Sequence, residues 1–136
     1  MKYYIGADLG TSALKLLLVD ECGQIRKKVS RSYEVCFPKP GWSEQHPEAW
    51  WEAFVTGVRE LTEGEETSLI RGIGFGGQMH GLVALDKDDR VIRPAILWND
   101  GRTDKETLYL NESVGTEVLS GHTANIAFPG FTAPKL

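Results

Sequence analysis

Two short apolar runs separated by three small residues open the chain, and they restrict what its first part can form. Residues 3–7 and 13–19 are rich in Ile, Leu, Val and Tyr and too short for stable helices, while Gly10-Thr11-Ser12 lies between them. A second turn at 20–23 leads into a polar, β-branched run at 24–35. We therefore expect three consecutive antiparallel strands joined by tight turns.

A helix is predicted after the breaker cluster at 37–41. Pro47 suits the first helical position, because the N–H that proline lacks would have no helical partner there. The apolar residues that follow recur at helical spacing and predict one buried face as far as about Gly64. They are Trp50, Trp51, Phe54, Val55, Val58 and Leu61.

The remaining pattern adds strands and helices to the sheet. Residues 70–75 predict a buried strand, and residues 82–85 and 91–97 predict a strand pair around a turn at 86–89. Thr103 and Glu106 fit a capping box before a helical segment that should break at Gly115. Residues 132–136 look like the start of a helix. The expected fold is α/β, with a mixed sheet and flanking helices.

Composition and charge exclude several classes of protein. With 136 residues, 41% hydrophobic, the chain fits one compact domain, and its net charge of −4 argues against a nucleic-acid or anionic-membrane partner. No run of about 18 apolar residues occurs, so no membrane span is expected. Cys22 and Cys36 lack CxxC spacing and are expected to be reduced thiols in a cytoplasmic protein.

The first turn carries the first candidate site. Asp8 ends the opening strand, where its carboxylate could hold Mg²⁺ through water. The backbone N–H groups of Gly10, Thr11 and Ser12 could bind phosphate oxygens, and Lys15 could add a positive charge. An ordinary hairpin whose Asp stabilises its own turn is the alternative. The GxxxxGK[ST] phosphate loop is absent.

A second candidate cluster lies between glycines, at Gln78, Met79 and His80. The amide of Gln78 and the imidazole of His80 offer donors and acceptors suited to sugar hydroxyls. Alternatively, His80 is a turn residue satisfied by the backbone and Met79 fills the core.

A third cluster follows an apolar run at Trp98 and Asn99. The indole could pack on the C–H face of a sugar, or Trp98 could belong to the core. Asp100 and Arg102, just beyond, could contact a ligand or form a structural ion pair.

Together and in this order, the clusters resemble the FGGY family of carbohydrate kinases, a branch of the actin-like (ribonuclease H-like) ATPases. The similar stretches are IGADLGTSALK, GWSEQHPEAWW, GQMHG, PAILWNDGRT and PGFTAPKL, and the last three are most similar to the xylulokinase branch. The resemblance covers essentially the whole chain. It implies that residues 1–136 are a truncated N-terminal domain, without the remainder of that domain and without the C-terminal domain.

The resemblance also implies a role for each candidate residue. Asp8 would be catalytic and would support Mg²⁺ at the transferring phosphate. The nucleotide phosphates would be held by Gly10, Thr11, Ser12 and Lys15. The ketose pocket would be formed by Gln78, Met79, His80, Trp98 and Asn99.

The function implied for the full-length protein is transfer of a phosphoryl group from ATP to D-xylulose, giving D-xylulose 5-phosphate. A kinase for ribulose, glycerol or gluconate, or a non-catalytic sugar-binding module, is the alternative. In the family, the catalytic aspartate and the adenine-binding domain come later in the chain, so residues 1–136 are expected to be inactive alone. Monomer and homodimer both stay open for the full-length protein.

Overall fold

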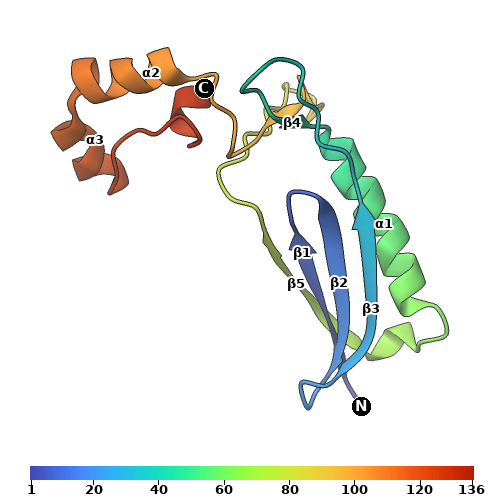
Figure 1. Ribbon diagram of the computed structural model, residues 1–136. Helices are drawn as coiled ribbons and strands as arrows, with labels where there is room; N and C mark the ends of the chain where they lie inside the picture. Colours follow the sequence, from blue (N-terminus) through green and yellow to red (C-terminus); the bar gives the residue numbers. More distant parts are fainter. The chain divides into compact units, whose positions relative to one another are not determined.

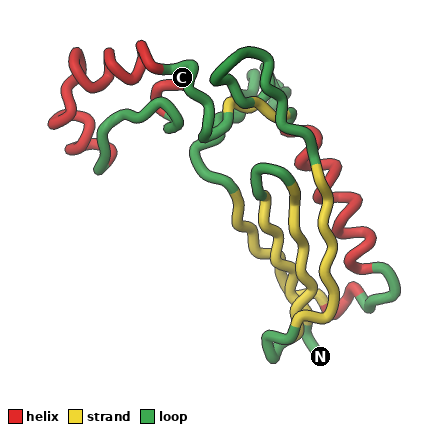
Figure 2. Tube along the Cα trace, viewed as in Figure 1, coloured by secondary structure: helices red, strands yellow, loops and turns green.

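The computed structural model describes all residues from 1 to 136, and they form two compact units. Unit 1 contains Met1–Glu34 and Pro47–Gln78, and unit 2 contains Val35–His46 and Met79–Leu136. Most strand residues belong to unit 1, whereas unit 2 is mainly loop and short helix (Figure 2). Cys22 and Cys36 are both free. None of the helices combines the length and apolar character that a membrane span requires.

Unit 1 is built on a four-stranded mixed sheet with the order β3-β2-β1-β5 (Figure 1). The strands are β1 Tyr3–Leu9, β2 Ala13–Asp20, β3 Ile25–Ser32 and β5 Ile70–Gly77. β2 pairs antiparallel with both β1 and β3, which confirms the three predicted antiparallel strands. β5 pairs parallel with β1 and makes the sheet mixed, as expected for the α/β class.

Helix α1, Pro47–Thr62, packs along β2 and β3 (Figure 1). It starts at Pro47 as predicted, and its buried stripe contains Ala53, Gly57 and Leu61. A Cβ at Gly57 would lie 2.6 Å from Leu16 Cδ1, so glycine lets the helix approach the sheet closely. Trp51, predicted to lie on the buried face, is instead 67% exposed. The small residues form the contact surface because they permit this close packing.

The prediction that β5 is buried is wrong. β5 is an edge strand, and along it Ile73 is 44% and Phe75 71% exposed. The physical reason is that α1 packs over β2 and β3, toward the opposite edge of the four-stranded sheet. Phe75 contacts Phe54 of α1, with the ring centroids 5.4 Å apart. β5 follows a short 3₁₀ helix, η1, at Thr67–Leu69.

Unit 2 contains a two-stranded sheet of β4, Glu44–Gln45, and β6, Ala95–Ile96. The predicted strand pair 82–85 and 91–97 forms only in part. Isolated antiparallel bridges join Leu82 to Ile96 and Leu85 to Val91, whereas the regular pairing of β6 is with β4. The predicted turn is present, closed by the Asp86 N–H donating to the Arg90 carbonyl at 2.8 Å. Pro94 precedes β6 and has no N–H to extend the ladder.

The helical segment of unit 2 is divided as predicted at Gly115, whose φ is +97°. It consists of α2 Asp104–Tyr109, a π-helical turn η2 Leu110–Gly115 and α3 Thr116–Thr123. The predicted capping box is wrong, because the Thr103 hydroxyl donates to the Pro129 carbonyl at 2.7 Å instead of capping α2. A short 3₁₀ helix, η3 Ala133–Lys135, forms where a helix start was predicted.

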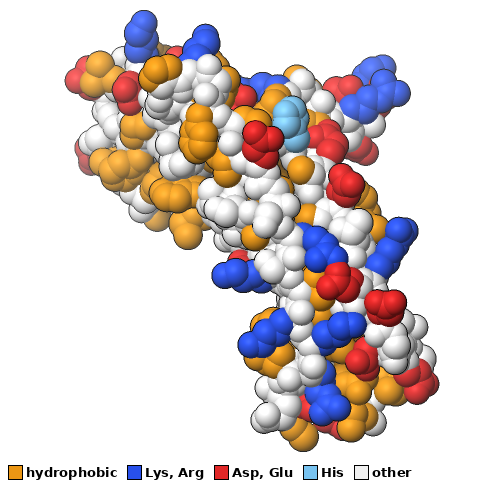
Figure 3. Space-filling model, turned by 45° about the vertical axis from the view of Figure 1, so that its right-hand side comes forward, with side chains coloured by type: hydrophobic (Ala, Val, Ile, Leu, Met, Phe, Trp, Pro, Cys, Tyr) orange, Lys and Arg blue, Asp and Glu red, His pale blue; other side chains and the backbone are white.

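Hydrophobic side chains are exposed over the helical part of unit 2 (Figure 3). Leu108 is 56%, Tyr109 62% and Val118 51% exposed. The two helices α2 and α3 therefore bury few of their own apolar residues within unit 2.

Candidate functional site

The turn between β1 and β2 presents a carboxylate and an ammonium on the same face of the sheet. Asp8 and Lys15 are directly opposite each other in the antiparallel register, and both are exposed. Opposed residues of an antiparallel pair point to the same side, with Cβ atoms about 5 Å apart. The two charges predicted to face a nucleotide phosphate are thus cross-strand neighbours.

A strip of glycines continues this face across β5. Gly72, Gly74 and Gly76 are the register partners of Tyr4, Gly6 and Asp8. A Cβ added at Gly72, Gly74 or Gly76 would meet no heavy atom within 4 Å. The backbone beside Asp8 is therefore open to the close approach of a ligand, which is a frequent reason for glycine in a strand.

The turn itself is held by hydrogen bonds within unit 1. The Gly10 N–H donates to the Ala13 carbonyl at 3.1 Å, so this N–H closes the hairpin. Gln78 lies against the same turn, since its N–H donates to the Leu9 carbonyl at 2.8 Å and its Oε1 accepts from the Thr11 hydroxyl at 3.4 Å. Gln78, predicted to shape the ketose pocket, thus contacts the predicted phosphate turn.

Tyr33, which follows β3, also contacts this turn, although no sequence pattern predicted it. Its hydroxyl donates to the Gly10 carbonyl and its N–H donates to the Ser12 carbonyl at 3.3 Å. Burial, together with the negative charge of Asp8, raises the pKa of Tyr33 to about 12. The β2–β3 register pairs Ala13 with Ser32, so a hairpin alignment could have placed Tyr33 beside the turn.

Tyr33→Phe is expected to change the pH dependence of stability. Because the folded pKa of about 12 exceeds the unfolded value of 10.0, the protonated phenol stabilises the fold below pH 10, and this contribution is lost as pH rises toward 12. The variant should lose less stability over that window, although removal of the hydrogen bond should cost about 1 kcal/mol at pH 7. Urea denaturation from pH 7 to 11.5 measures both, with the exposed Tyr4→Phe as control. If the free energy of unfolding fell equally with rising pH in the Tyr33 variant and in the wild type, this role would be contradicted.

The predicted ketose residues of unit 2 are accessible. Met79 is 66% and Trp98 48% exposed, and Asn99 is also exposed. The segments that carry Met79 and Trp98 lie side by side, because the Leu82 N–H donates to the Ile96 carbonyl at 3.1 Å. Because it is about half exposed, Trp98 is not a core residue.

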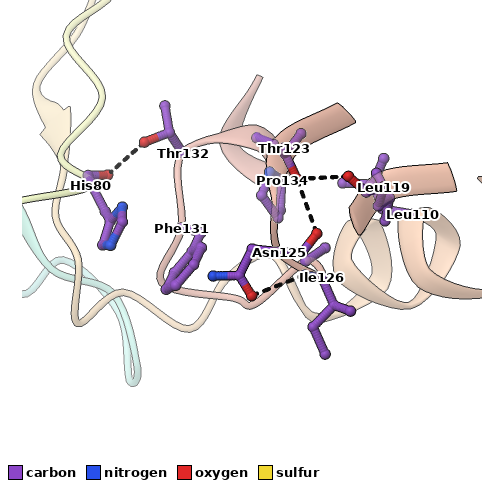
Figure 4. Close-up of a pocket in the computed structure, with 11 residues that line it drawn as sticks. His80, Leu110, Leu119, Thr123, Asn125, Ile126, Phe131, Thr132 and Pro134 are labelled. Atoms are coloured by element: carbon purple, nitrogen blue, oxygen red, sulfur yellow. Dashed lines mark hydrogen bonds between the residues drawn. The ribbon is translucent and has the colours of Figure 1, made fainter. Parts of the chain in front are cut away.

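His80 lies at the edge of an apolar pocket of about 290 Å³ (Figure 4). Its ring stacks on Phe131, with centroids 4.1 Å apart and planes at 15°, and Leu119 and Ile126 also line the pocket. The backbone of His80 is left-handed, with φ +59°, a conformation that costs a non-glycine residue about 1–2 kcal/mol. Asn99 lines a different hollow, beside Trp42 and Ser43. The structure therefore does not bring Asn99 to the His80 pocket.

Asp100 and Arg102 form a structural ion pair. Asp100 is 2% exposed and accepts from Arg102 Nε at 2.9 Å, from an Arg102 terminal nitrogen at 2.7 Å and from the Ser43 N–H at 2.6 Å. Arg102 also pairs with Glu44 at 2.7 Å and lies 3.6 Å from the Trp42 ring centroid. Burial alone would raise the pKa of Asp100, but these hydrogen bonds lower it below its ordinary value. Its charge is thus satisfied inside unit 2.

The donor set at the turn fits a nucleotide-bound metal ion better than a protein-held one. The structure contains no cluster of three or more His, Cys, Asp or Glu side chains arranged as metal ligands. A single exposed carboxylate, Asp8, suits Mg²⁺, because that ion retains several waters and takes most of its remaining ligands from phosphate oxygens.

The chain is similar to known proteins over its whole length. The chain is 44% identical to the xylulose kinase of Staphylococcus xylosus over 136 residues, which are all of this chain and 28% of that protein. It is 44% identical to the xylulose kinase of Escherichia coli K12 over 134 residues, 98% of this chain and 27% of that protein. The chain thus spans less than a third of these relatives.

Solved structures share the fold. A crystal structure of a xyloylose kinase from Brucella ovis matches with a TM-score of 0.90 and 46% identity, over 98% of this chain and 28% of that one. Plasmodium falciparum glycerol kinase with ADP matches in fold, with a TM-score of 0.83 at 20% identity, over 99% of this chain and 28% of that one. Residues 3–136 match the sequence model of the N-terminal domain of FGGY carbohydrate kinases. The chain therefore belongs to the FGGY family of carbohydrate kinases.

Proposed function

We propose that the full-length protein containing this chain transfers the γ-phosphoryl group of ATP to a hydroxyl of D-xylulose, giving D-xylulose 5-phosphate and ADP. The observation that carries the proposal is the exposed pair of Asp8 and Lys15 on the open, glycine-lined face of unit 1, in a chain of this family. The choice of ketose is supported by the xylulose kinases that are 44% identical to the chain. A cytoplasmic location stays a prediction.

Unit 1 would supply the phosphate side of the reaction. Phosphoryl transfer depends on positioning and on neutralising charge at the phosphate oxygens rather than on covalent chemistry by the protein. Lys15 and the turn at Thr11 and Ser12 would bind those oxygens, and Asp8 would hold the waters of Mg²⁺. The Gly10 N–H, predicted to bind phosphate, instead donates to the Ala13 carbonyl. Tyr33 would keep the turn in shape through the Gly10 and Ser12 carbonyls. When bound, Mg²⁺ would neutralise the negative charge of the phosphates.

Unit 2 would supply contacts to the sugar. Met79 and Trp98 are exposed and His80 is half-buried. They lie on neighbouring segments and combine an imidazole with two apolar surfaces. Such a set matches a ketose, whose carbon atoms present both hydroxyl and C–H groups. Asn99 and Gln78 contact other parts of the chain, so we assign them a weaker contribution to the ketose site.

The catalytic base and the adenine site would lie beyond residue 136. In this proposal the base accepts the proton of the attacking hydroxyl. Residues 1–136 alone would bind substrate but would not catalyse phosphoryl transfer. ADP release by the 136-residue chain, compared with the full-length protein at equal concentration, tests this part. Ketose-dependent turnover by the isolated chain would contradict it.

A substrate panel tests the choice of sugar. The full-length protein is assayed with Mg-ATP and D-xylulose, D-ribulose, glycerol or gluconate, and kcat/KM is compared. We expect D-xylulose to give the highest value. Gluconate deserves inclusion because a gluconate kinase from Lactobacillus acidophilus shares the fold, with a TM-score of 0.81 at 28% identity. A higher kcat/KM for any of the other three would reject D-xylulose as the substrate.

A further inference from the structure

Lys135, in η3, is a buried cation that binds three main-chain carbonyls. Lys135 is only 5% exposed. Its ammonium donates to the carbonyls of His80, Leu97 and Gly130, each at 2.8 Å. An ammonium has three N–H donors and here each has an acceptor. This arrangement satisfies a charge that would otherwise be costly to bury.

The three carbonyls come from segments that are far apart in sequence. They lie in the peptide groups that lead from His80 to Gly81, from Leu97 to Trp98 and from Gly130 to Phe131. Two of these peptide groups border residues proposed to contact the ketose. One ammonium therefore fixes the backbone beside both His80 and Trp98.

The segment before Lys135 makes further contacts with His80. The Thr132 hydroxyl donates to the same His80 carbonyl at 3.4 Å, and the Phe131 ring stacks on the imidazole (Figure 4). A Cβ at Gly130 would lie 2.1 Å from the Trp98 carbonyl oxygen, so this backbone approach requires glycine. These contacts hold His80 in its left-handed conformation, which a free chain would populate rarely.

The protonation of Lys135 agrees with this arrangement. Burial lowers the pKa of Lys135 to about 8, with the negative charge of Asp100 raising it and the positive charge of Arg102 lowering it further. At pH 7 the ammonium is still the main form, so all three donors are present.

We propose that Lys135 is a positioning residue of the ketose site, which holds the backbone at His80 and Trp98 in the geometry that binds the sugar. This inference rests on the proposed function and assigns it a residue that does not itself touch the substrate. Lys135→Met, which keeps a linear apolar side chain but removes the three donors, should displace His80 and weaken ketose binding.

The displacement is measured by NMR on the 136-residue chain. The chain has three histidines, His46, His80 and His122, and we expect each to give its own imidazole ¹H–¹⁵N signal, so that two of them serve as internal references. We expect Lys135→Met to shift the His80 signal and to leave the other two in place. The control is Lys105→Met, the same change at an exposed position of α2.

Binding is measured by steady-state kinetics of the full-length protein. Lys135→Met should raise the KM for D-xylulose about tenfold, because misplaced contact groups lose binding, while the KM for ATP stays within about twofold. Lys135→Arg retains charged donors and should recover part of the loss. Thr132→Val, which removes only the weaker hydroxyl contact to His80, should act in the same direction with a smaller effect.

The outcomes separate the two proposals. An unchanged His80 signal, an unchanged KM for D-xylulose, or equal rises in both KM values would overturn the role of Lys135. If Lys135→Met does not fold, Thr132→Val decides by the same readings. A wild-type protein without ketose kinase activity would reject the proposed function, while the His80 signal would still report whether Lys135 fixes that residue.

Discussion

Asp8→Asn is expected to lower the kcat of the full-length protein by at least about 100-fold, the usual cost of removing one group that stabilises charge in a transition state. The variant keeps the size of the side chain and removes its charge, so the turn should still form. The KM for D-xylulose should change less than about threefold, because the proposed role of Asp8 is at the phosphate and not at the sugar. Steady-state kinetics with both substrates varied measures these parameters. Glu21→Gln, an exposed charge removal in the next turn, is the control.

His80→Ala should give the opposite kinetic pattern. Because His80 is proposed to contact the ketose, its removal should raise the KM for D-xylulose more than it lowers kcat. The same assay measures both parameters. If Asp8→Asn and His80→Ala changed kcat and KM in the same proportions, the assignment of Asp8 to the phosphate and His80 to the sugar would be wrong.

Asp100→Ala is expected to destabilise the chain by about 3 kcal/mol. The carboxylate is buried, and its removal leaves the Ser43 N–H and the Arg102 N–H without their acceptor, although Arg102 retains Glu44. Breaking a buried charge pair from one side costs about 3–5 kcal/mol, and the remaining partner places this case at the lower end. Urea denaturation at pH 7 measures the loss.

The exposed Asp88→Ala is the matched control and should change stability by less than about 0.5 kcal/mol. Acid provides a second reading, because the folded pKa of Asp100 is lowered below 3.8. Its stabilising contribution is therefore present above that pH and is lost as pH falls through the folded pKa. The wild type should lose stability in acid more steeply than Asp100→Ala. Equal losses would show that the carboxylate contributes little to the fold.

Local patterns predicted the part of the fold that depends on neighbours in sequence. The antiparallel strands β1 to β3 follow from short apolar runs and turn residues, and α1 follows from its spacing and Pro47. The exposure of Phe75 could not be predicted in this way. An apolar strand is expected to be buried. Only the three-dimensional structure shows that α1 packs on β2 and β3 and leaves most of β5 uncovered.

The residues that shape the candidate site were the hardest to predict. Tyr33 contacts Gly10 across 23 residues and Lys135 contacts His80 across 55, and neither contact leaves a periodic signal in the sequence. The candidate polar residues Asp8, Gln78 and His80 could be identified from the sequence because they lie close to glycines. Their roles at the phosphate and the sugar stay predictions, whereas the choice between ligand contact and ion pair at Asp100 is decided by its burial against Arg102.

Transfer of a phosphoryl group from ATP to a ketose is the activity that we propose for the full-length protein. The most direct measurement is a ³¹P NMR time course of the full-length protein with Mg-ATP and D-xylulose. We expect a new phosphomonoester signal that grows in step with ADP and depends on D-xylulose. Its rate of growth should be at least about 100-fold lower in Asp8→Asn. Intact ATP in the presence of D-xylulose, or release of inorganic phosphate in place of the sugar phosphate, would contradict it.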